Sequence, residues 1–254
     1  MSRMATEFEM HHHVKYYECD TSGHPTLAMI VAMLILASEA DNKENGVGLK
    51  RAGQYGGGWV IINYEGTLAE KQPVKGEEVI LGTRVRAYNR FFVIRDFWVK
   101  DLAGNYYAKV SGTFVFMNLA KRKIMTIPQE MIETFQMDET KRLPRLEKPS
   151  LPEDQAGWAK RDYRVRYFDI DGNQHVNNAH YFEWMMDVLD GDFLRTHQVV
   201  KMQTEFAHEV RYGQTVTSTG STPVEKEGLM VTHHQITCQG QESARATFYW
   251  QPRN

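Results

Sequence analysis

The residues with the clearest chemical potential are a carboxylate, an amide and an imidazole that alternate over five positions: Asp171, Asn173 and His175. In an extended chain, side chains two positions apart point to the same side, so these three could converge on one small volume. An apolar helical pattern follows directly, near Asn178, and a helix start offers unpaired backbone N–H groups to an anion or a polarised carbonyl oxygen. A base or nucleophile beside such donors is the minimum equipment for acyl transfer.

The same stretch also has a purely structural interpretation. Aspartate, asparagine and glycine are common loop residues, and Asn177 or Asn178 would make a good helix N-cap. The motif alone leaves both interpretations open, so the elements around it must decide between a catalytic loop and a capped turn.

The composition is that of an ordinary globular protein. The chain has 254 residues, of which 42% are hydrophobic and 24% charged, and its net charge of −2 argues against nucleic acid as a partner. Its two cysteines, Cys19 and Cys238, and an N-terminus without an apolar core are typical of a cytoplasmic protein. The longest apolar run, residues 27–37, is shorter than the roughly 18 residues of a membrane span, so we expect a helix buried on all sides and no stable membrane association.

Three sequence matches, in the same order, relate the first half of the chain to the second. One constant spacing separates Asp20 from Asp171 and His24 from His175. The other two matches pair residues 72–76 with 209–213 and residues 113–116 with 247–250. The repetition predicts two copies of one α+β unit, each a long helix followed by an antiparallel sheet that wraps it.

The expected unit boundaries follow from composition. A charged stretch with three prolines, residues 137–158, predicts a linker between an N-terminal unit (1–136) and a C-terminal unit (159–254). The expected strands are residues 14–19, 59–64, 79–88, 91–100, 106–117 and 124–127 in the first unit and 162–167 in the second, before further strands to the end. The expected helices are residues 25–37, with an end near 41–42, then 128–135, and 178 to about 193.

The second-half motif resembles the signature of a known family. The run of residues 169–178, with Tyr181 and Trp184 after it, is similar to the signature of fatty acyl-ACP thioesterases, the FatA/FatB class and its bacterial relatives. Residues 205–210 resemble the second catalytic segment of that family, and the resemblance extends over roughly residues 14–250. It implies a double hotdog fold, that is, two tandem hotdog units, each a long helix wrapped by an antiparallel β-sheet.

The resemblance also implies the chemistry. Asp171, Asn173, His175 and Glu209 occupy the family's catalytic positions, and the expected reaction is hydrolysis of fatty acyl-ACP in fatty acid biosynthesis. Asp171 would act as nucleophile or primary base, while His175 and Glu209 would hold and deprotonate water. Asn173 would orient its neighbours or donate to substrate, and the N–H groups after Asn178 would stabilise the oxyanion. Members of the family often carry cysteine after the glutamate, but here Val210 follows it, so a carboxylate must do the work.

The two copies differ at the positions that matter. The first copy keeps Asp20 and His24, but has Ser22 where the second has Asn173 and Gln72 where it has Glu209. This asymmetry predicts one active site, in the second half, with the first half lining an acyl-chain pocket. We expect no cofactor and no metal ion. The His11-His12-His13 triplet precedes an expected strand, and adjacent His233 and His234 would point to opposite faces of theirs.

The expected partner is an acyl carrier protein (ACP) bearing a fatty acyl chain. Because ACP is acidic, a basic patch should receive it. The candidates are Lys121, Arg122, Lys123, Arg84, Arg86, Arg90 and Arg95, and the sequence singles out none of them. A homodimer stays open.

Three other functions compete with this expectation. An acyl-CoA thioesterase would use the same groups on a different carrier. A double-hotdog hydratase or dehydratase typically has a proline between the asparagine and the histidine, which is absent here. A non-catalytic acyl-binding sensor would usually carry a DNA-binding segment, and no such pattern is present in the sequence.

Overall fold

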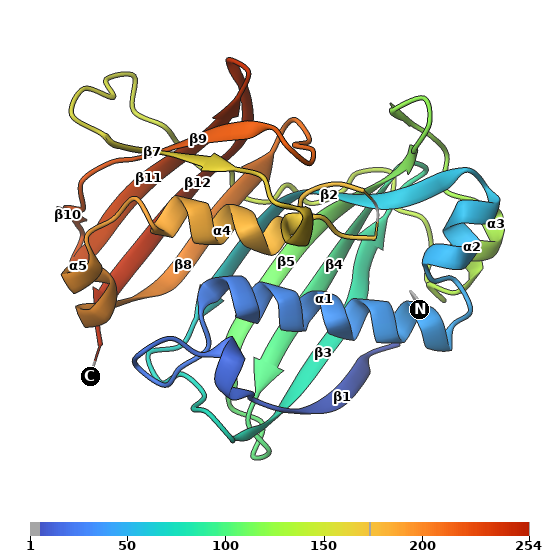
Figure 1. Ribbon diagram of the computed structural model, residues 1–254. Coiled ribbons are helices and arrows are strands. Elements are labelled where there is room, and N and C mark those ends of the chain that lie inside the picture. Colours follow the sequence, from blue (N-terminus) through green and yellow to red (C-terminus); the bar gives the residue numbers. More distant parts are fainter. Residues whose placement is uncertain (1–5, 173, 254) are drawn as a thin grey trace.

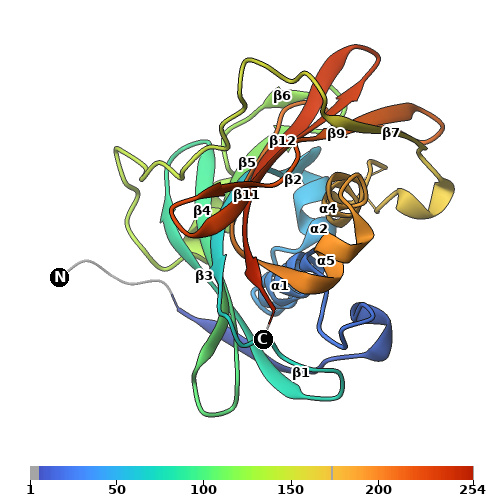
Figure 2. The same cartoon turned by 90° about the vertical axis from the view of Figure 1, so that its left-hand side faces the viewer.

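The computed structural model describes residues 6–172 and 174–253, so the predicted site residue Asn173 lies outside the described residues. The described chain forms one 12-stranded sheet with its helices gathered on one face (Figures 1 and 2). The first half comprises β1 (Phe8–His13), η1 (Tyr16–Glu18), α1 (Leu27–Glu44), α2 (Leu49–Gln54), β2 (Gly57–Leu68), β3 (Glu78–Tyr88), β4 (Phe92–Lys100), β5 (Tyr106–Asn118), β6 (Lys123–Ile124) and α3 (Gln129–Glu133). The second half comprises β7 (Ala159–Arg164), η2 (Tyr167–Asp169), α4 (Asn178–Met186), α5 (Gly191–Thr196), β8 (His197–Phe206), β9 (Thr215–Gly220), β10 (Val224–Lys226), β11 (Leu229–Cys238) and β12 (Gln241–Pro252).

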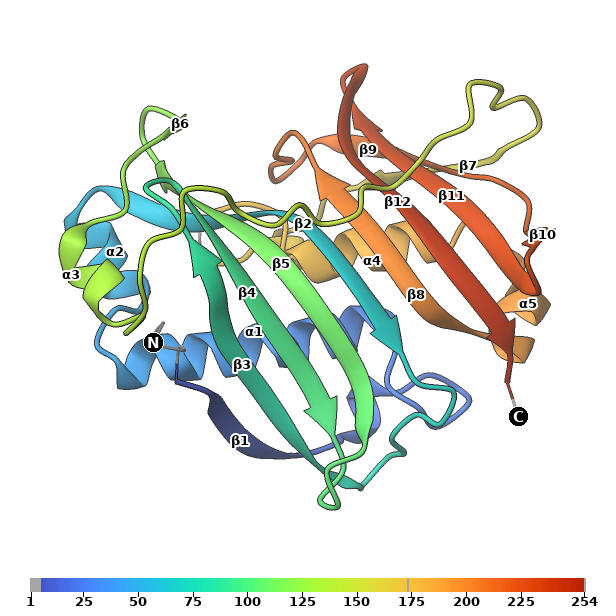
Figure 3. The ribbon, with the colours of Figure 1, turned by 180° about the vertical axis from the view of Figure 1, so that it is seen from behind.

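The two halves of the sheet have the same strand order when each is followed outward from the centre. The path runs β1-β3-β4-β5-β2 and continues as β8-β12-β11-β9-β7, so each half lays its strands in the same order outward from the join. The join itself is the antiparallel pair β2–β8, in register from Asn63 opposite Glu205 to Thr67 opposite Lys201. With a central helix on each half of the sheet, α1 of 18 residues and α4 of 9, the predicted α+β hotdog fold is confirmed (Figure 3).

Helix α1 fills the concave side of the first half. The hydroxyl oxygen of Thr26 accepts a hydrogen bond from Met29 N (3.2 Å) and caps the helix, and the apolar run that follows packs against β3 and α4. Leu34 and Ala37 are fully buried. The expectation of a helix buried on all sides was wrong at the outer stripe, where Leu36 is 41% exposed because nothing in the described chain covers that side. In the part of the chain that the structure describes, no helix is both long and apolar enough to cross a membrane.

Two strands lie closer to the N-terminus than expected, and in both a side-chain carboxylate bonded to the backbone ends the extended segment. The strands expected at residues 14–19 and 162–167 are instead β1 and β7, and the chain then turns through η1 and η2. The Glu18 carboxylate accepts a hydrogen bond from Lys15 N (2.6 Å), and that of Asp169 accepts one from Arg166 N (2.7 Å). Each buried carboxylate therefore bends the chain out of the sheet before the motif begins.

The helix expected to run from residue 178 to about 193 is two helices. Helix α4 ends at Met186, and a new cap forms where the Asp190 carboxylate accepts hydrogen bonds from Asp192 N (2.8 Å) and Phe193 N (3.2 Å). An aspartate in this role stabilises a helix start and disfavours a helix interior, which explains the break. The short helix expected near residues 128–135 is present as α3.

The segment between the halves, residues 137–158, contains no helix or strand and runs over the sheet face opposite the helices (Figure 3). It is nevertheless attached along its course. Ser150 N donates to the Thr247 hydroxyl (3.1 Å), Ser150 O lies 2.7 Å from His233 Nδ1, and Lys148 pairs with Glu205. These contacts hold the segment against β8, β11 and β12.

Candidate active site

The motif lies in a tight loop between η2 and α4. Asp171 N donates to His175 O (2.8 Å) and Gln174 N donates to Asp171 O (3.1 Å), while Gln174 adopts a left-handed conformation with φ of 67°. The loop closes with a bridge between Ile170 and Val176. Asp171 and His175 therefore approach each other because the chain folds back, not because it is extended as the spacing suggested.

The capping interpretation of the same stretch is also correct in part. The side-chain oxygen of Asn177 accepts a hydrogen bond from Ala179 N (3.0 Å), which makes Asn177 the N-cap of α4. His180 N donates to Asn177 O (3.0 Å). The N–H groups of Ala179 and His180 therefore take part in capping, and Asn178, the first residue of α4, borders the cavity; which N–H group would stabilise an oxyanion stays a prediction.

Three of the four predicted site residues meet in one place. His175 Nε2 lies 2.9 Å from Glu209 Oε2, and His175 N lies 3.4 Å from the Asp171 Oδ1 atom. Glu209 comes from the β8–β9 connection, which is fixed to the motif loop by a hydrogen bond from Val176 N to Val210 O (3.2 Å). The fourth, Asn173, lies outside the described residues, so its place in the site stays a prediction.

These side chains border an open cavity of about 1200 Å³ that both halves line. From the second half, Asp171, His175 and Glu209 stand at its wall. The apolar part of the wall comes mostly from α1, β2, β5 and the segments that flank them, as Ile35, Val47, Trp59, Val60, Ile61, Phe114, Met117 and Leu119. The lining thus combines an apolar wall with polar and charged side chains, which suits a ligand that has an apolar part and a polar, reactive end.

The electrostatic setting favours a neutral imidazole. Burial lowers the pKa of His175, and the positive charges of Arg122 and Arg211 lower it further, against an opposing effect of Asp171. A neutral histidine can accept a proton near neutral pH, which a general base must do.

Arg122 is a site residue that sequence reasoning missed. Its guanidinium forms an ion pair with Glu209, and it borders the same cavity. The sequence placed it among candidates for a basic docking patch, since Lys121 and Lys123 flank it. No local pattern could have found its role, because Arg122 belongs to the first half and meets Glu209 only in the folded chain.

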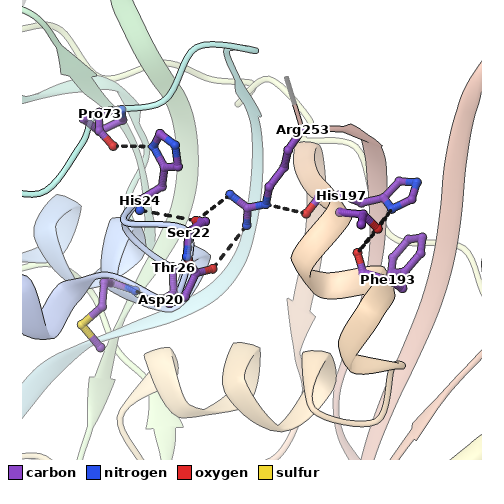
Figure 4. A network of polar contacts seen from close by, with 10 residues as sticks. Asp20, Ser22, His24, Thr26, Pro73, Phe193, His197 and Arg253 are labelled. Atoms are coloured by element: carbon purple, nitrogen blue, oxygen red, sulfur yellow. Dashed lines mark hydrogen bonds and ion pairs between the residues drawn. The ribbon is translucent and has the colours of Figure 1, made fainter.

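The first-half counterpart of the motif has a different use (Figure 4). Arg253 donates from Nη2 to Asp20 Oδ2 (3.3 Å) and from Nη1 to the Ser22 hydroxyl (3.1 Å). His24 Nδ1 lies 2.9 Å from Pro73 O, and the buried Gln72 amide contacts the carbonyl of Ala69. The described residues that line the cavity include none of Asp20, Ser22, His24 and Gln72.

The position after Glu209 also bears on mechanism. Val210 is fully buried and is not among the described residues of the cavity wall. A side chain there points into the core, so even a cysteine would not face the site. Across the described residues, no group of three or more histidine, cysteine, aspartate and glutamate side chains could hold a metal ion. His234 is buried in β11 and His233 points to the other face, as predicted.

Comparison with known proteins gives a consistent result. Residues 5–135 match the acyl-ACP thioesterase N-terminal domain, and residues 153–252 match the acyl-ACP thioesterase C-terminal domain. The fold is similar to that of a candidate oleoyl thioesterase from Lactobacillus plantarum, with 34% identity, a TM-score of 0.94 and 98% of each chain covered. It is also similar to the 12:0-ACP thioesterase from Umbellularia californica, with 22% identity, a TM-score of 0.82, and 97% of this chain and 94% of that one covered, a likeness that concerns the fold alone.

Curated plant proteins match more distantly. A chloroplastic acyl-[acyl-carrier-protein] hydrolase of Cuphea viscosissima is 25% identical over 204 residues, which cover 77% of this chain and 49% of the relative. The chloroplastic dodecanoyl-[acyl-carrier-protein] hydrolase of Umbellularia californica is 28% identical over 211 residues, covering 77% and 53%. The chain thus spans about half the length of the curated relatives it matches.

Proposed function

The chain belongs to the acyl-ACP thioesterase family, and from this premise we propose that it hydrolyses fatty acyl-ACP to free fatty acid and the carrier thiol. The observation that carries the proposal is the meeting of Asp171, His175 and Glu209 at one cavity with an apolar wall. Such a cavity holds an acyl chain by burying its methylene groups, at about 0.8 kcal/mol for each. The polar end of the cavity then receives the thioester carbonyl.

In the proposed reaction, Asp171 is the nucleophile or primary base. If Asp171 attacks, an acyl anhydride forms as the C–S bond breaks, and the departing thiolate takes a proton from solvent; water then cleaves the anhydride, its proton passes through the His175–Glu209 pair to solvent, and the Asp171 carboxylate is restored. If water attacks directly, its proton passes to the His175–Glu209 pair, and the thiolate leaves with a proton. Asn173 would orient these groups, and Asn178 N would donate to the oxyanion.

The two units divide these tasks in the proposal. Residues 1–136 provide most of the apolar wall of the acyl pocket, residues 159–254 provide the catalytic groups, and residues 137–158 connect them. Supporting evidence is the first-half loop, whose Asp20 is bonded to Arg253 instead of bordering the cavity.

The proposed partner is an acidic acyl carrier protein, and the proposed compartment is the cytoplasm. Two free cysteines, of which Cys238 is buried, support a reducing environment. A homodimer is a further proposal; size-exclusion chromatography with light scattering would test it.

The decisive assay is thiol release from acyl-ACP, followed with a disulfide reagent. We expect release by the wild type and a loss of at least about 10³-fold in Asp171→Asn, because the nucleophile or base is removed. The matched control is Asp20→Asn, the same change in the first-half loop, with activity within about twofold. A hydratase would alter the acyl chain without releasing thiol, and an acyl-binding sensor would do neither. Faster turnover of acyl-CoA than of acyl-ACP would identify coenzyme A as the carrier.

A second experiment separates the two routes. Hydroxylamine added during a single turnover captures an anhydride at Asp171 as the acyl hydroxamate, whereas direct attack by water gives free acid alone. A fatty-acid profile of cells that express the protein would then identify the preferred chain length.

A further inference from the structure

Arg122 lies on the turn between β5 and β6, and the turn itself aims its side chain inward. Asn118 organises this turn, since Asn118 O accepts a hydrogen bond from Arg122 N and Asn118 Oδ1 accepts one from Lys121 N, both at 2.8 Å. Arg122 has a φ of 52°, a left-handed conformation that is uncommon for arginine. The side chains of its neighbours, Lys121 and Lys123, are exposed, while that of Arg122 borders the cavity.

The Glu209 carboxylate lies between two partners. Its Oε1 atom pairs with the Arg122 guanidinium, and its Oε2 atom lies 2.9 Å from His175 Nε2. The side chains of Arg122 and Glu209 are 28% and 26% exposed, so both charges are partly removed from water. Arg122 Nη1 is buried and has no hydrogen-bond partner among the described residues. A partly buried guanidinium held this way is stabilised by its carboxylate partner, because leaving such a charge unpaired costs free energy.

Resting on the function proposed above, we propose that Arg122 is a positioning residue of the thioesterase site: it fixes the Glu209 carboxylate against His175. The first half of the chain thus provides a charged member of the catalytic machinery as well as the pocket wall.

The charge of Arg122 has a definite effect on the imidazole. The charged groups that face His175 are Asp171 on its own loop, Glu209 and Arg211 on the β8–β9 connection, and Arg122 on the β5–β6 turn. Other ionisable side chains border the same cavity, namely Glu39, Lys43, Lys50, Arg51, Glu130 and His208. Without Arg122, Glu209 would stand beside the imidazole without its ion-pair partner, and a carboxylate there favours the protonated ring. With Arg122, that preference is offset and the ring stays available as a base.

A merely structural role would look different. If Arg122 only held the two halves together, its loss would lower thermal stability and the amount of active protein, and the pH dependence of the remaining activity would be unchanged. The pH profile therefore separates the two roles.

The test compares Arg122→Gln with the wild type on acyl-ACP across pH 5 to 9. We expect kcat to fall by roughly 10-fold to 100-fold, with KM within about threefold, because positioning affects the transition state more than substrate binding. We expect the acid limb of kcat/KM to move up by about 1 pH unit, because His175 loses a nearby positive charge and faces a carboxylate that has lost its ion-pair partner. Arg122→Lys keeps the charge and should leave the limb in place, with a smaller loss in kcat.

The matched control is Lys121→Gln, which removes the same charge from the same turn at an exposed side chain and should leave kcat and the acid limb unchanged, even if KM for the acidic carrier rises. The proposal would be overturned if Arg122→Gln lost activity at all pH values without a shift of the acid limb. It would also be overturned if kcat and the pH profile of Arg122→Gln were the same as those of the wild type.

A measurement that needs no turnover distinguishes this inference from the proposed function. NMR titration of the His175 ring should give a higher pKa in Arg122→Gln than in the wild type. If the wild type releases no thiol from any acyl-ACP, the proposed function fails. If the wild type is active and the His175 titration is the same in Arg122→Gln, only the role of Arg122 fails.

Discussion

Replacing Arg253 with alanine should destabilise the fold without affecting turnover. The side chain of Arg253 donates three hydrogen bonds: Nε to His197 O (3.0 Å), Nη1 to the Ser22 hydroxyl (3.1 Å) and Nη2 to Asp20 Oδ2 (3.3 Å) (Figure 4). It thereby connects the second half of the chain to the first-half copy of the candidate catalytic loop. Its backbone is held independently, since Arg253 N donates to Thr196 O (2.8 Å).

The magnitude follows from these contacts. Each of the two bonds to neutral acceptors contributes about 1 kcal/mol net. Arg253 and Asp20 are 21% and 35% exposed, so solvent screening limits their ion pair to at most about 1 kcal/mol. We therefore expect the free energy of unfolding to fall by about 2–3 kcal/mol, which for a chain of this length corresponds to a Tm lower by about 5–10 °C.

Differential scanning calorimetry and urea unfolding measure this change. The matched control is Arg161→Ala, which removes an ion pair with Asp187 whose two side chains are 54% and 57% exposed; its Tm should change by no more than about 2 °C. A double-mutant cycle with Asp20→Ala should show coupling. A Tm decrease below about 2 °C in Arg253→Ala, or fully additive effects in the cycle, would refute the idea that Asp20 is retained for stability.

Other predictions concern the site and the core. Because burial and positive charge lower the pKa of His175, kcat/KM should rise with pH through a midpoint below 6.5 and then level off. Asp171→Ala should abolish turnover while Asp20→Ala keeps it within about twofold of wild type; equal losses would contradict a single site. Val210→Cys should keep wild-type turnover and gain no sensitivity to thiol reagents, because that side chain is fully buried. Burial lowers the pKa of His234 to about 3, so below pH 6.5 protons bind more strongly to the unfolded chain. As the pH falls from there, this group should lower the free energy of unfolding by about 1.4 kcal/mol per pH unit. Urea unfolding at several pH values should show that His234→Gln removes this part of the decline.

The internal repeat could be found in the sequence because both copies keep glycine at a turn that needs a positive φ. Gly76 and Gly213 occupy matched positions, both with positive φ, of 86° and 81°. Gly76 N donates to Val14 O and Gly213 N donates to Val165 O. Such a turn requires glycine, so the match persisted where the surrounding side chains diverged.

The strand boundaries were less readable because they depend on single carboxylates. Glu18 and Asp169 look like ordinary members of an alternating pattern, yet each accepts a backbone N–H and ends the extended segment. Local side-chain hydrogen bonds of this kind compete with strand pairing, and a periodicity argument does not register them.

The sequence predicted only those parts of the candidate site that lie close together along the chain. Asp171, His175 and Asn177 belong to one loop, and Asn177 proved to be the cap that the sequence suggested. The partners that come from distant segments were not readable in this way. Glu209 came from a resemblance, and Arg122 emerged only when the β5–β6 turn was seen beside the β8–β9 connection.

The β2–β8 join has a consequence for dissecting the molecule. Because neighbouring strands of the two halves are hydrogen-bonded from Asn63 opposite Glu205 to Thr67 opposite Lys201, a cleaved backbone between residues 137 and 158 would leave the halves associated. Two fragments produced separately would each expose an unpaired edge that the other fits. If mixing the fragments restored turnover, the fragments must have paired through β2 and β8, since neither fragment alone contains both Arg122 and Glu209.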